Sequence, residues 1–207
     1  MVVGLKINKK ESEKMAKYKN YEYVGKNGKK DYRKTVLLDK NNEIINVSYS
    51  KKRKKCWYAA DNYTYTDIQI YGRRDIEDRT NTIFITNDEE DTEILNNTGV
   101  SAINFAHTMM EERELMDYLP RLFKNFKKVF ILDDFLESLR DVNYKGLKQT
   151  FLEKLSELPN IKEIIILDPR KVHYMYKTIN DIVKINNKNG KCEEEFLQLI
   201  KTSERYK

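Results

Sequence analysis

Acidic side chains follow three short apolar runs of the chain. Residues 82–86, 129–132 and 164–167 are rich in Ile, Val, Leu and Phe, and carboxylates come directly or almost directly after each run. Carboxylate oxygens are preferred ligands of Mg²⁺ and Mn²⁺, and carboxyl groups also act as general acids or bases. The acids concerned are Asp88, Glu89, Glu90, Asp91, Asp133, Asp134 and Asp168. We expect either no cofactor or a weak Mg²⁺ or Mn²⁺ site, with these candidate ligands: Asp88, Glu89, Asp91, Asp133 and Asp134.

The three apolar runs are typical of buried strands in a parallel sheet. Residues 100–105 predict one more strand, and amphipathic helical patterns lie between the strands. The helical patterns cover residues 91–97, 111–123 and 145–158. In an open α/β sheet the working crevice lies outside the carboxyl ends of the strands. We therefore expect the acids to gather along one edge of the sheet.

The part of the chain before residue 81 follows another pattern. Short strands are predicted over residues 21–24, 32–38, 43–50 and 56–60, and Asn27-Gly28 can supply the positive φ of a hairpin turn. The predicted fold class is α+β, with a small antiparallel β-meander followed by an α/β domain built on a four-stranded, mostly parallel sheet. The expected divisions are a basic arm or short helix over 1–20, the β-region over 21–80, the α/β domain over 81–185 and a C-terminal helix over 186–207.

Charge is divided unevenly along the chain. Residues 1–80 hold 20 Lys and Arg against 11 Asp and Glu, a net charge of +9, and residues 81–207 hold 19 against 22, a net charge of −3. The most concentrated basic run stands beside aromatic side chains, so it could neutralise phosphates while a ring stacks on an unpaired base. The residues predicted to bind nucleic acid are Lys51, Lys52, Arg53, Lys54, Lys55, Trp57, Arg73 and Arg74. The alternative is a solvated hairpin tip with Trp57 packed under the sheet.

Several classes of protein are not indicated by the sequence. No run approaches the roughly 18 consecutive apolar residues of a membrane span, and the segment after Met1 lacks the apolar core of a secretory signal, so we expect a cytoplasmic protein. Cys56 and Cys192 lie far apart and outside any Cys-x-x-Cys pair, which argues against a disulfide framework or a four-cysteine zinc site. No phosphate-binding Gly-x-x-x-x-Gly-Lys-Ser/Thr loop is present.

Three segments resemble the motifs of Toprim domains in phage and plasmid primases. Residues 83–95, followed by Gly99 and a short strand, resemble the first motif, in which an apolar strand leads to Glu-Gly-Glu-x-Asp and a helix. Residues 129–134 resemble the second motif, a strand ending in Asp-x-Asp, and residues 176–183 resemble a later Lys-Asp-x-Asn-Asp segment. The β-region with Trp57 also resembles the part that precedes these motifs. The resemblance implies a Toprim-like α/β domain, nucleic-acid partners and metal-dependent chemistry.

The chain departs from the family's pattern at its carboxylates. Asn87 stands at the position of the first-motif Glu, which the family uses as general acid/base or metal ligand. Phe135 stands at the second Asp of Asp-x-Asp, and Thr178 replaces the first Asp of the later segment. If residues 133–135 are extended, Asp134 points to the opposite face and cannot stand in for position 135. These substitutions argue against ordinary two-metal phosphoryl transfer.

These observations lead to one principal functional hypothesis and two alternatives. The first is a catalytically impaired, primase-like protein of a phage or mobile element that binds single-stranded DNA or RNA, or a nucleoprotein complex, with one version acting as an inhibitor of a host nuclease or defence system. The second is an active, divergent metal-dependent primase or Toprim nuclease, in which Glu89 and Asp133 would be catalytic. The third is a protein-interaction module that does not bind nucleic acid.

Overall fold

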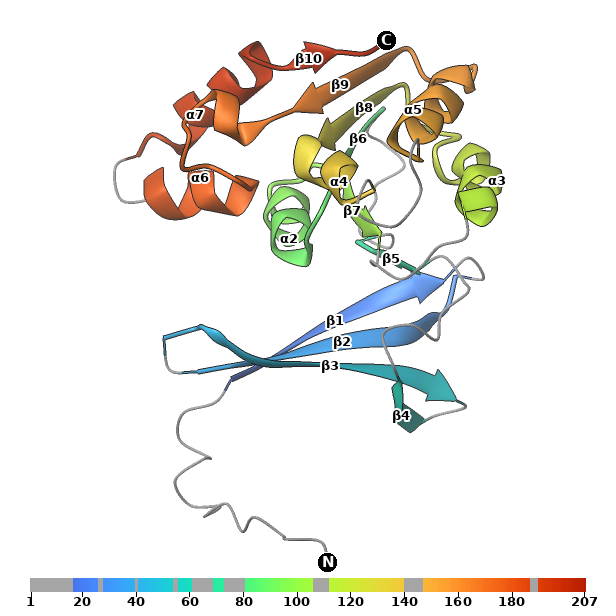
Figure 1. Ribbon diagram of the computed structural model, residues 1–207, viewed down its shortest axis with the longest axis vertical. Helices are drawn as coiled ribbons and strands as arrows, with labels where there is room; N and C mark the ends of the chain where they lie inside the picture. The colour runs from blue at the N-terminus through green and yellow to red at the C-terminus, as the bar shows by residue number, and fades with distance from the viewer. Residues whose placement is uncertain are drawn as a thin grey trace, which may run out of the picture.

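The computed structural model describes residues 17–25, 28–39, 41–53, 56–60, 69–72, 81–105, 112–139, 147–186 and 190–207. Ten strands of the described residues form one continuous mixed sheet, in the order β10-β9-β8-β6-β7-β5-β1-β2-β3-β4. Figure 1 shows a twisted antiparallel part at one end of the molecule and a part covered by helices at the other. The α+β class is therefore confirmed.

The first four strands form the antiparallel meander that the sequence predicts. They are β1 (Lys17–Gly25), β2 (Lys30–Leu38), β3 (Ile44–Arg53) and β4 (Cys56–Ala60), each paired antiparallel with the next. Gly28 has a φ of 77°, which suits the turn between β1 and β2. β1 begins four residues before the expected strand, at Lys17. The predicted basic arm otherwise lies outside the described residues.

The remaining elements form the α/β unit, which here denotes β6 to β10 with their helices. Its strands are β6 (Thr82–Thr86), β7 (Ala102–Phe105), β8 (Lys128–Leu132), β9 (Glu163–Leu167) and β10 (Glu204–Arg205). Its helices are α2 (Glu89–Asn97), α3 (Glu112–Leu122), α4 (Asp133–Ser138), α5 (Leu147–Glu157), α6 (Ile179–Asn186) and α7 (Cys192–Lys201). The 3₁₀ turn η1 (Pro169–Lys171) follows β9. The predicted strands β7, β6, β8 and β9 do run parallel. β10 pairs antiparallel with β9.

The expectation of a separate four-stranded sheet is wrong, because a short strand joins the two parts. β5 (Gln69–Tyr71) pairs antiparallel with β1 on one side and with β7 on the other. Gly72 follows it with a φ of 77°, and a Cβ there would lie 2.5 Å from the Ala102 carbonyl oxygen. Only glycine permits this close approach to β7. A three-residue strand carries too little pattern to be recognised from sequence alone.

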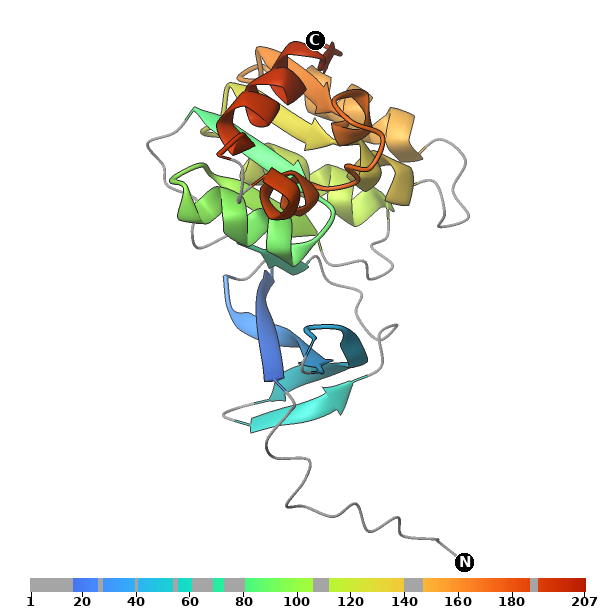
Figure 2. The same ribbon diagram turned by 90° about the vertical axis from the view of Figure 1, so that its left-hand side faces the viewer.

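Alternating side chains of the parallel strands fill two cores, one on each face of the sheet. Ile83 and Ile85 of β6 point into the core beneath α3, α4 and α5, and Phe84 points into the core beneath α2, α6 and α7. Figure 2 shows the helices on both faces of the sheet. The meander has its own smaller core, rich in tyrosine. Among the described residues, every helix is too short or too polar to cross a membrane.

Phe135 is part of the larger core. The strand β8 ends at Leu132 and α4 begins at Asp133, so residues 133–135 are helical rather than extended. Phe135 is 2% exposed, and its ring lies 5.7 Å from that of Phe105 and 5.6 Å from that of Phe151. The position at which the resembling family has an acid therefore belongs to the core in this chain.

Candidate functional site

The first candidate acids lie at the start of α2, where β6 ends. Asp88 caps the helix, and its side chain accepts a hydrogen bond of 2.7 Å from the backbone N–H of Asp91. Glu89, Glu90 and Asp91 form the first helical turn, where negative charge is favoured by the helix dipole. The helix therefore begins two residues earlier than the sequence pattern indicates, and part of this acidic run has a capping role.

Glu89 is bound by two side chains of the meander. It is 6% exposed, the Tyr23 hydroxyl donates a hydrogen bond to Oε1, and Lys34 Nζ lies 3.0 Å and 2.9 Å from its two oxygens. Burial and the nearby Glu89 carboxylate raise the pKa of Tyr23, so the phenol remains a proton donor to this carboxylate. The predicted catalytic carboxylate is thus enclosed between the meander and α2.

The neighbouring acids of α2 also have partners within the chain. Asp91 is fully buried and accepts hydrogen bonds of 2.9 Å and 2.7 Å from the backbone N–H groups of Ile179 and Asn180, at the start of α6. The Asn180 side-chain amide donates to Glu90, which also lies 3.5 Å from Lys19 Nζ. These acids hold α6 and the meander against α2.

The pKa values of three carboxylates on this edge are raised. Burial raises the pKa of Asp88, and the charges of Glu89 and Glu90 add to the shift. Burial raises the pKa of Asp91, and the charges of Asp88 and Asp134 add to the shift. Burial, together with the charge of Asp88, raises the pKa of Asp134 to about 7, although the Phe135 backbone N–H and the Asn87 side chain favour its ionised form. Asp134 therefore lies in the same acidic group as Asp88, because α4 starts directly after β8 and turns it toward β6.

Asp133 belongs to a different group. Its Oδ2 lies 2.8 Å from Arg170 Nη2, and its Oδ1 lies 3.4 Å from Lys148 Nζ. Arg170 also pairs with Asp168, at the end of β9, and with Glu137 of α4. The acids predicted to gather along one edge are thus divided into two groups, one around Asp88 and one around Arg170.

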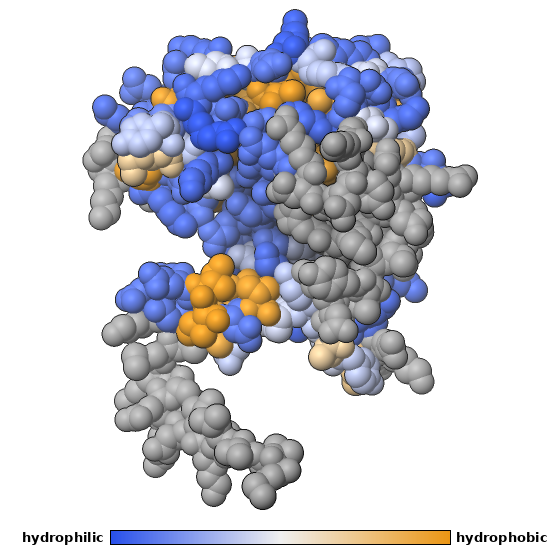
Figure 3. Space-filling view, in the orientation of Figure 1, coloured by the Kyte–Doolittle hydropathy of each residue, from blue (hydrophilic) through white to orange (hydrophobic). Residues whose placement is uncertain are grey.

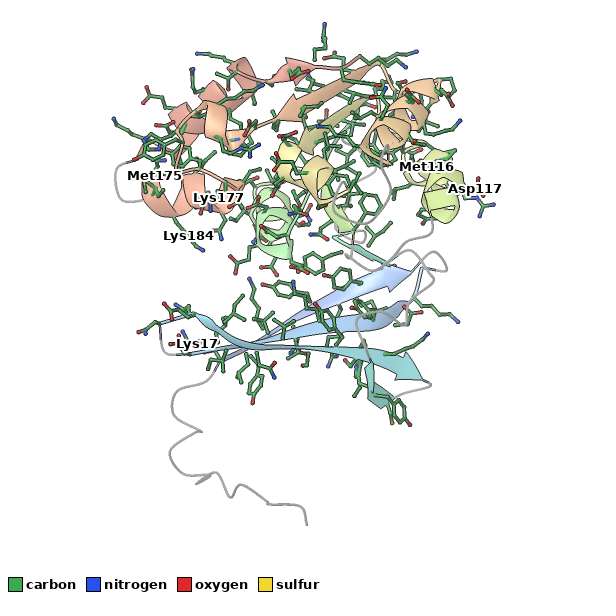
Figure 4. The ribbon with its side chains drawn as sticks, in the orientation of Figure 1. Lys17, Met116, Asp117, Met175, Lys177 and Lys184 are labelled. Atoms are coloured by element: carbon green, nitrogen blue, oxygen red, sulfur yellow. The ribbon has the colours of Figure 1, made fainter. Side chains whose placement is uncertain are left out.

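A cleft of about 320 Å³ separates part of the meander from the α/β unit. Its lining combines cations, acids and an apolar wall: Lys19, Tyr21, Lys34, Val36, Leu38, Asn42, Ile44, Asp88, Glu89, Glu90 and Lys184. Figure 3 shows an apolar patch of the meander bordering this gap. Figure 4 shows Lys17 of the meander on the same side of the molecule as Lys177 and Lys184. Of the lysines that line the cleft, Lys19 and Lys34 come from the meander and Lys184 comes from α6.

The predicted nucleic-acid-binding residues do not share one face of the sheet. Lys51 pairs with Tyr58, and Lys52 pairs with Trp57, so the two lysines and their partners point to opposite faces of β3 and β4. Lys51 lies opposite Tyr32, on the face whose core packs toward α2, and Lys52 lies on the outer face. Arg53 ends β3, whereas Lys54, Lys55, Arg73 and Arg74 lie outside the described residues.

The outer face has a cation–aromatic group that includes a residue not predicted from the sequence. The Arg33 guanidinium lies 4.0 Å from the centroid of the half-buried Trp57 ring, and Lys52 Nζ lies 5.6 Å from it. Arg33 also donates a 2.6 Å hydrogen bond to Glu22. Arg33 is 24 residues away from Trp57 in sequence, so only the pairing of β2, β3 and β4 reveals this group.

The described carboxylates do not fit a resident divalent ion well. Glu89, Asp91 and Asp133 already bind Lys34, backbone N–H groups and Arg170, respectively. Within the described part of the chain, no group of three or more His, Cys, Asp or Glu side chains has the arrangement of a metal site. The weak Mg²⁺ or Mn²⁺ site stays a prediction that these contacts do not favour.

Comparison with known proteins finds distant structural similarity to a solved structure. No protein-family model and no curated protein sequence matches the chain. A solved structure, the primase fragment of the bacteriophage T7 primase-helicase protein, aligns with 13% sequence identity and a TM-score of 0.46. The alignment covers 88% of this chain and 62% of the T7 fragment. A similarity of this size does not by itself support a functional conclusion.

The pairing of Glu89 with the meander predicts a measurable coupling. Lys34→Met should lower the free energy of unfolding by roughly 2–4 kcal/mol, because it leaves a buried carboxylate without its cation. Glu89→Gln in the same chain should restore part of this loss, giving a coupling energy of about 1–3 kcal/mol in a double-mutant cycle measured by urea unfolding. Lys52→Met on the outer face is the control. Additive effects of Lys34→Met and Glu89→Gln would contradict the assigned contact.

The raised pKa of Asp134 predicts a pH dependence of stability. Between about pH 4 and pH 7 the native state keeps a proton that the unfolded chain has lost, so the free energy of unfolding falls as pH rises. Asp134→Asn should remove this pH dependence. The difference in the free energy of unfolding between the variant and wild type should therefore be roughly 1–3 kcal/mol more favourable to the variant at pH 8 than at pH 5. Urea unfolding at both pH values measures the effect, with Asp117→Asn on exposed α3 surface as control. Equal pH slopes for wild type and Asp134→Asn would refute the assignment.

Proposed function

We propose that the protein is a primase-like, catalytically impaired protein that binds single-stranded nucleic acid through the outer face of its meander. The observation that carries this proposal is the enclosure of Glu89 by Tyr23 and Lys34. In a working site the basic meander would hold a substrate strand against an accessible carboxylate. Here Lys34 of the meander binds that carboxylate itself.

The positions of the other acids support the loss of catalysis. A general base must come within hydrogen-bond reach of the proton that it removes. Asn87, at the first-motif position, has an amide that does not exchange a proton usefully. Asp133 is paired with Arg170 and Lys148, and Phe135 is a core residue. The positions that the resemblance marks as catalytic therefore serve packing and charge pairing.

The composition of the meander's outer face supports nucleic-acid binding. Arg33 and Lys52 can contact phosphates, and Trp57 offers an aromatic surface for a base. Residues 1–80 carry a net charge of +9, which would attract a polyanion from a distance. Glu22 engages one side of Arg33, so the bound strand would have to tolerate or displace this contact.

One observation favours a second candidate, an active metal-dependent primase or nuclease. Burial and then the charges of neighbouring carboxylates raise the pKa values of Asp88, Asp91 and Asp134, and a divalent cation would relieve the repulsion that the neighbouring charges add. Glu89 would then have to leave Tyr23 and Lys34 to act. The phage origin, the inhibitor role, the cytoplasmic location and the interaction module stay predictions.

The two faces of β3 and β4 supply matched variants for a binding test. In fluorescence anisotropy with labelled single-stranded DNA or RNA at low salt, Lys52→Ala should weaken binding and lower the salt dependence by about one phosphate contact. Trp57→Ala should weaken binding by about 5- to 150-fold, the equivalent of 1–3 kcal/mol for one stacked base. The inner-face variants Lys51→Ala and Tyr58→Ala should have little effect. Absence of binding at low salt, or equal effects on both faces, would refute the proposal.

A further inference from the structure

The meander ends in a strand with an open edge. β4 is the last strand in the order of the sheet, and within the described part of the chain it pairs with β3 on one side and with no strand on the other. Figure 1 shows β4 at this end of the meander. The backbone N–H and C=O groups along an open edge can pair with a strand of another chain.

This edge lacks the features that usually prevent such pairing. Natural edge strands are commonly protected by charged side chains, proline or a β-bulge. β4 consists of five uncharged residues, and its pairing with β3 runs through all five without a register shift. The Tyr58 side chain is 53% exposed. A regular, uncharged edge with an exposed aromatic residue, in the basic half of the chain, therefore indicates a surface for another strand.

We infer that this edge pairs antiparallel with β4 of a second copy of the chain, about a two-fold axis at Tyr58. In this register Tyr58 lies opposite Tyr58 of the second copy, Trp57 lies opposite Ala59, and Cys56 lies opposite Ala60. It is the register in which all five residues of both strands are paired. The same surface of each copy then contacts the other, as a two-fold dimer requires. The inference goes beyond nucleic-acid binding and does not depend on it.

The distribution of charge favours a second copy as the partner. Lys51 lies on β3 opposite Tyr58, so the two Lys51 residues of the dimer are three strand spacings, or about 14 Å, apart. This separation exceeds the Debye length of about 8 Å at physiological ionic strength. In the sequence, Lys55 precedes β4 and Asp61 follows it. Antiparallel pairing reverses this order in the second copy, so opposite charges meet at both ends of the paired strands.

The dimer would extend the outer face of the meander. The two-fold axis of an antiparallel strand pair is perpendicular to the sheet, so the outer faces of both copies lie on one side. Trp57 of one copy becomes the diagonal neighbour of Trp57 of the other, at about 7–8 Å. Each ring keeps its own Arg33 and Lys52. Two cation–aromatic groups thus become one continuous surface.

Sedimentation equilibrium without nucleic acid tests the dimer. The mass of the wild-type chain should rise with protein concentration toward twice the monomer mass. Tyr58→Lys places like charges opposite each other at the axis and should weaken association at least about tenfold. Tyr18→Lys, at a tyrosine of β1 that is 69% exposed, should associate as wild type does. A wild-type chain that stays monomeric, or equal effects of the two variants, would overturn the inference.

Cysteine cross-linking tests the register and does not depend on Tyr58→Lys. In a chain with Cys56→Ser and Cys192→Ser, Tyr58→Cys brings two thiols to the axis, at a Cα separation of about 4.5–5.5 Å that a disulfide can span. Mild oxidation should give a covalent dimer, whereas Tyr18→Cys in the same chain should stay monomeric.

The native Cys56 supplies a second control for the register. It is exposed, but in the inferred register it lies opposite Ala60 and four residues away from Cys56 of the second copy. A chain that carries Cys192→Ser alone should therefore not cross-link. Cross-linking through Cys56, or its absence in folded Tyr58→Cys, would overturn the inference. Both experiments omit nucleic acid, so this inference and the binding proposed for Lys52 and Trp57 can fail separately.

Discussion

The contact of Glu89 with Tyr23 and Lys34 fixes the relation between the two parts of the molecule. β5 joins the parts through backbone hydrogen bonds, but it is only three residues long. The side chains around Glu89 add a buried hydrogen bond and an ion pair between β1, β2 and α2. Lys19 extends the contact by pairing with Glu93 at 2.9 Å. A charged group as buried as Glu89 requires such partners, because the cost of burying it alone is large.

A common principle connects this contact with most of the acidic edge: like Glu89, the acids Asp91, Asp133 and Asp168 are compensated by partners within the chain. Asp91 accepts two backbone N–H groups of α6, and Asp133 and Asp168 share Arg170. The incompletely compensated region is the one around Asp88 and Asp134, where burial and the charges of neighbouring carboxylates raise the pKa values. In an open α/β sheet the active site usually lies at the carboxyl ends of the strands. In this chain most acids at that edge instead form ion pairs and hydrogen bonds that hold helices and strands together.

The sequence predicted the parallel strands well because their signal is local. Runs such as Ile164 to Leu167 are almost fully apolar, and the helices between them leave few alternatives for their pairing. The meander was predicted for a similar reason, from strand patterns and the Asn27-Gly28 turn. The prediction of a four-stranded sheet failed at β5, whose three residues join the meander to the α/β unit. This join depends on the close approach of Gly72 to the Ala102 carbonyl group of β7.

The site was less predictable because its decisive partners are distant in sequence. Tyr23 precedes Glu89 by 66 residues and Lys34 precedes it by 55, so no local motif announces either contact. Arg33 was missed for the same reason. The separation of Lys51 from Lys52 was within reach of sequence reasoning, since neighbours on a strand point to opposite faces. Asp134 lies in the group around Asp88 because a helix starts at Asp133. The apolar run that ends at Leu132 does not specify where this helix starts.

The central claim is that the carboxylates of this edge hold the structure together and do not transfer phosphoryl groups. A denaturing gel of labelled single-stranded DNA and RNA, incubated with the protein, four nucleoside triphosphates and Mg²⁺ or Mn²⁺, tests it most directly. Strands of unchanged length are the predicted result. Lengthened or shortened products that require the metal and disappear with Glu89→Gln would contradict the account, because they would show that Glu89 leaves Tyr23 and Lys34 to take part in catalysis.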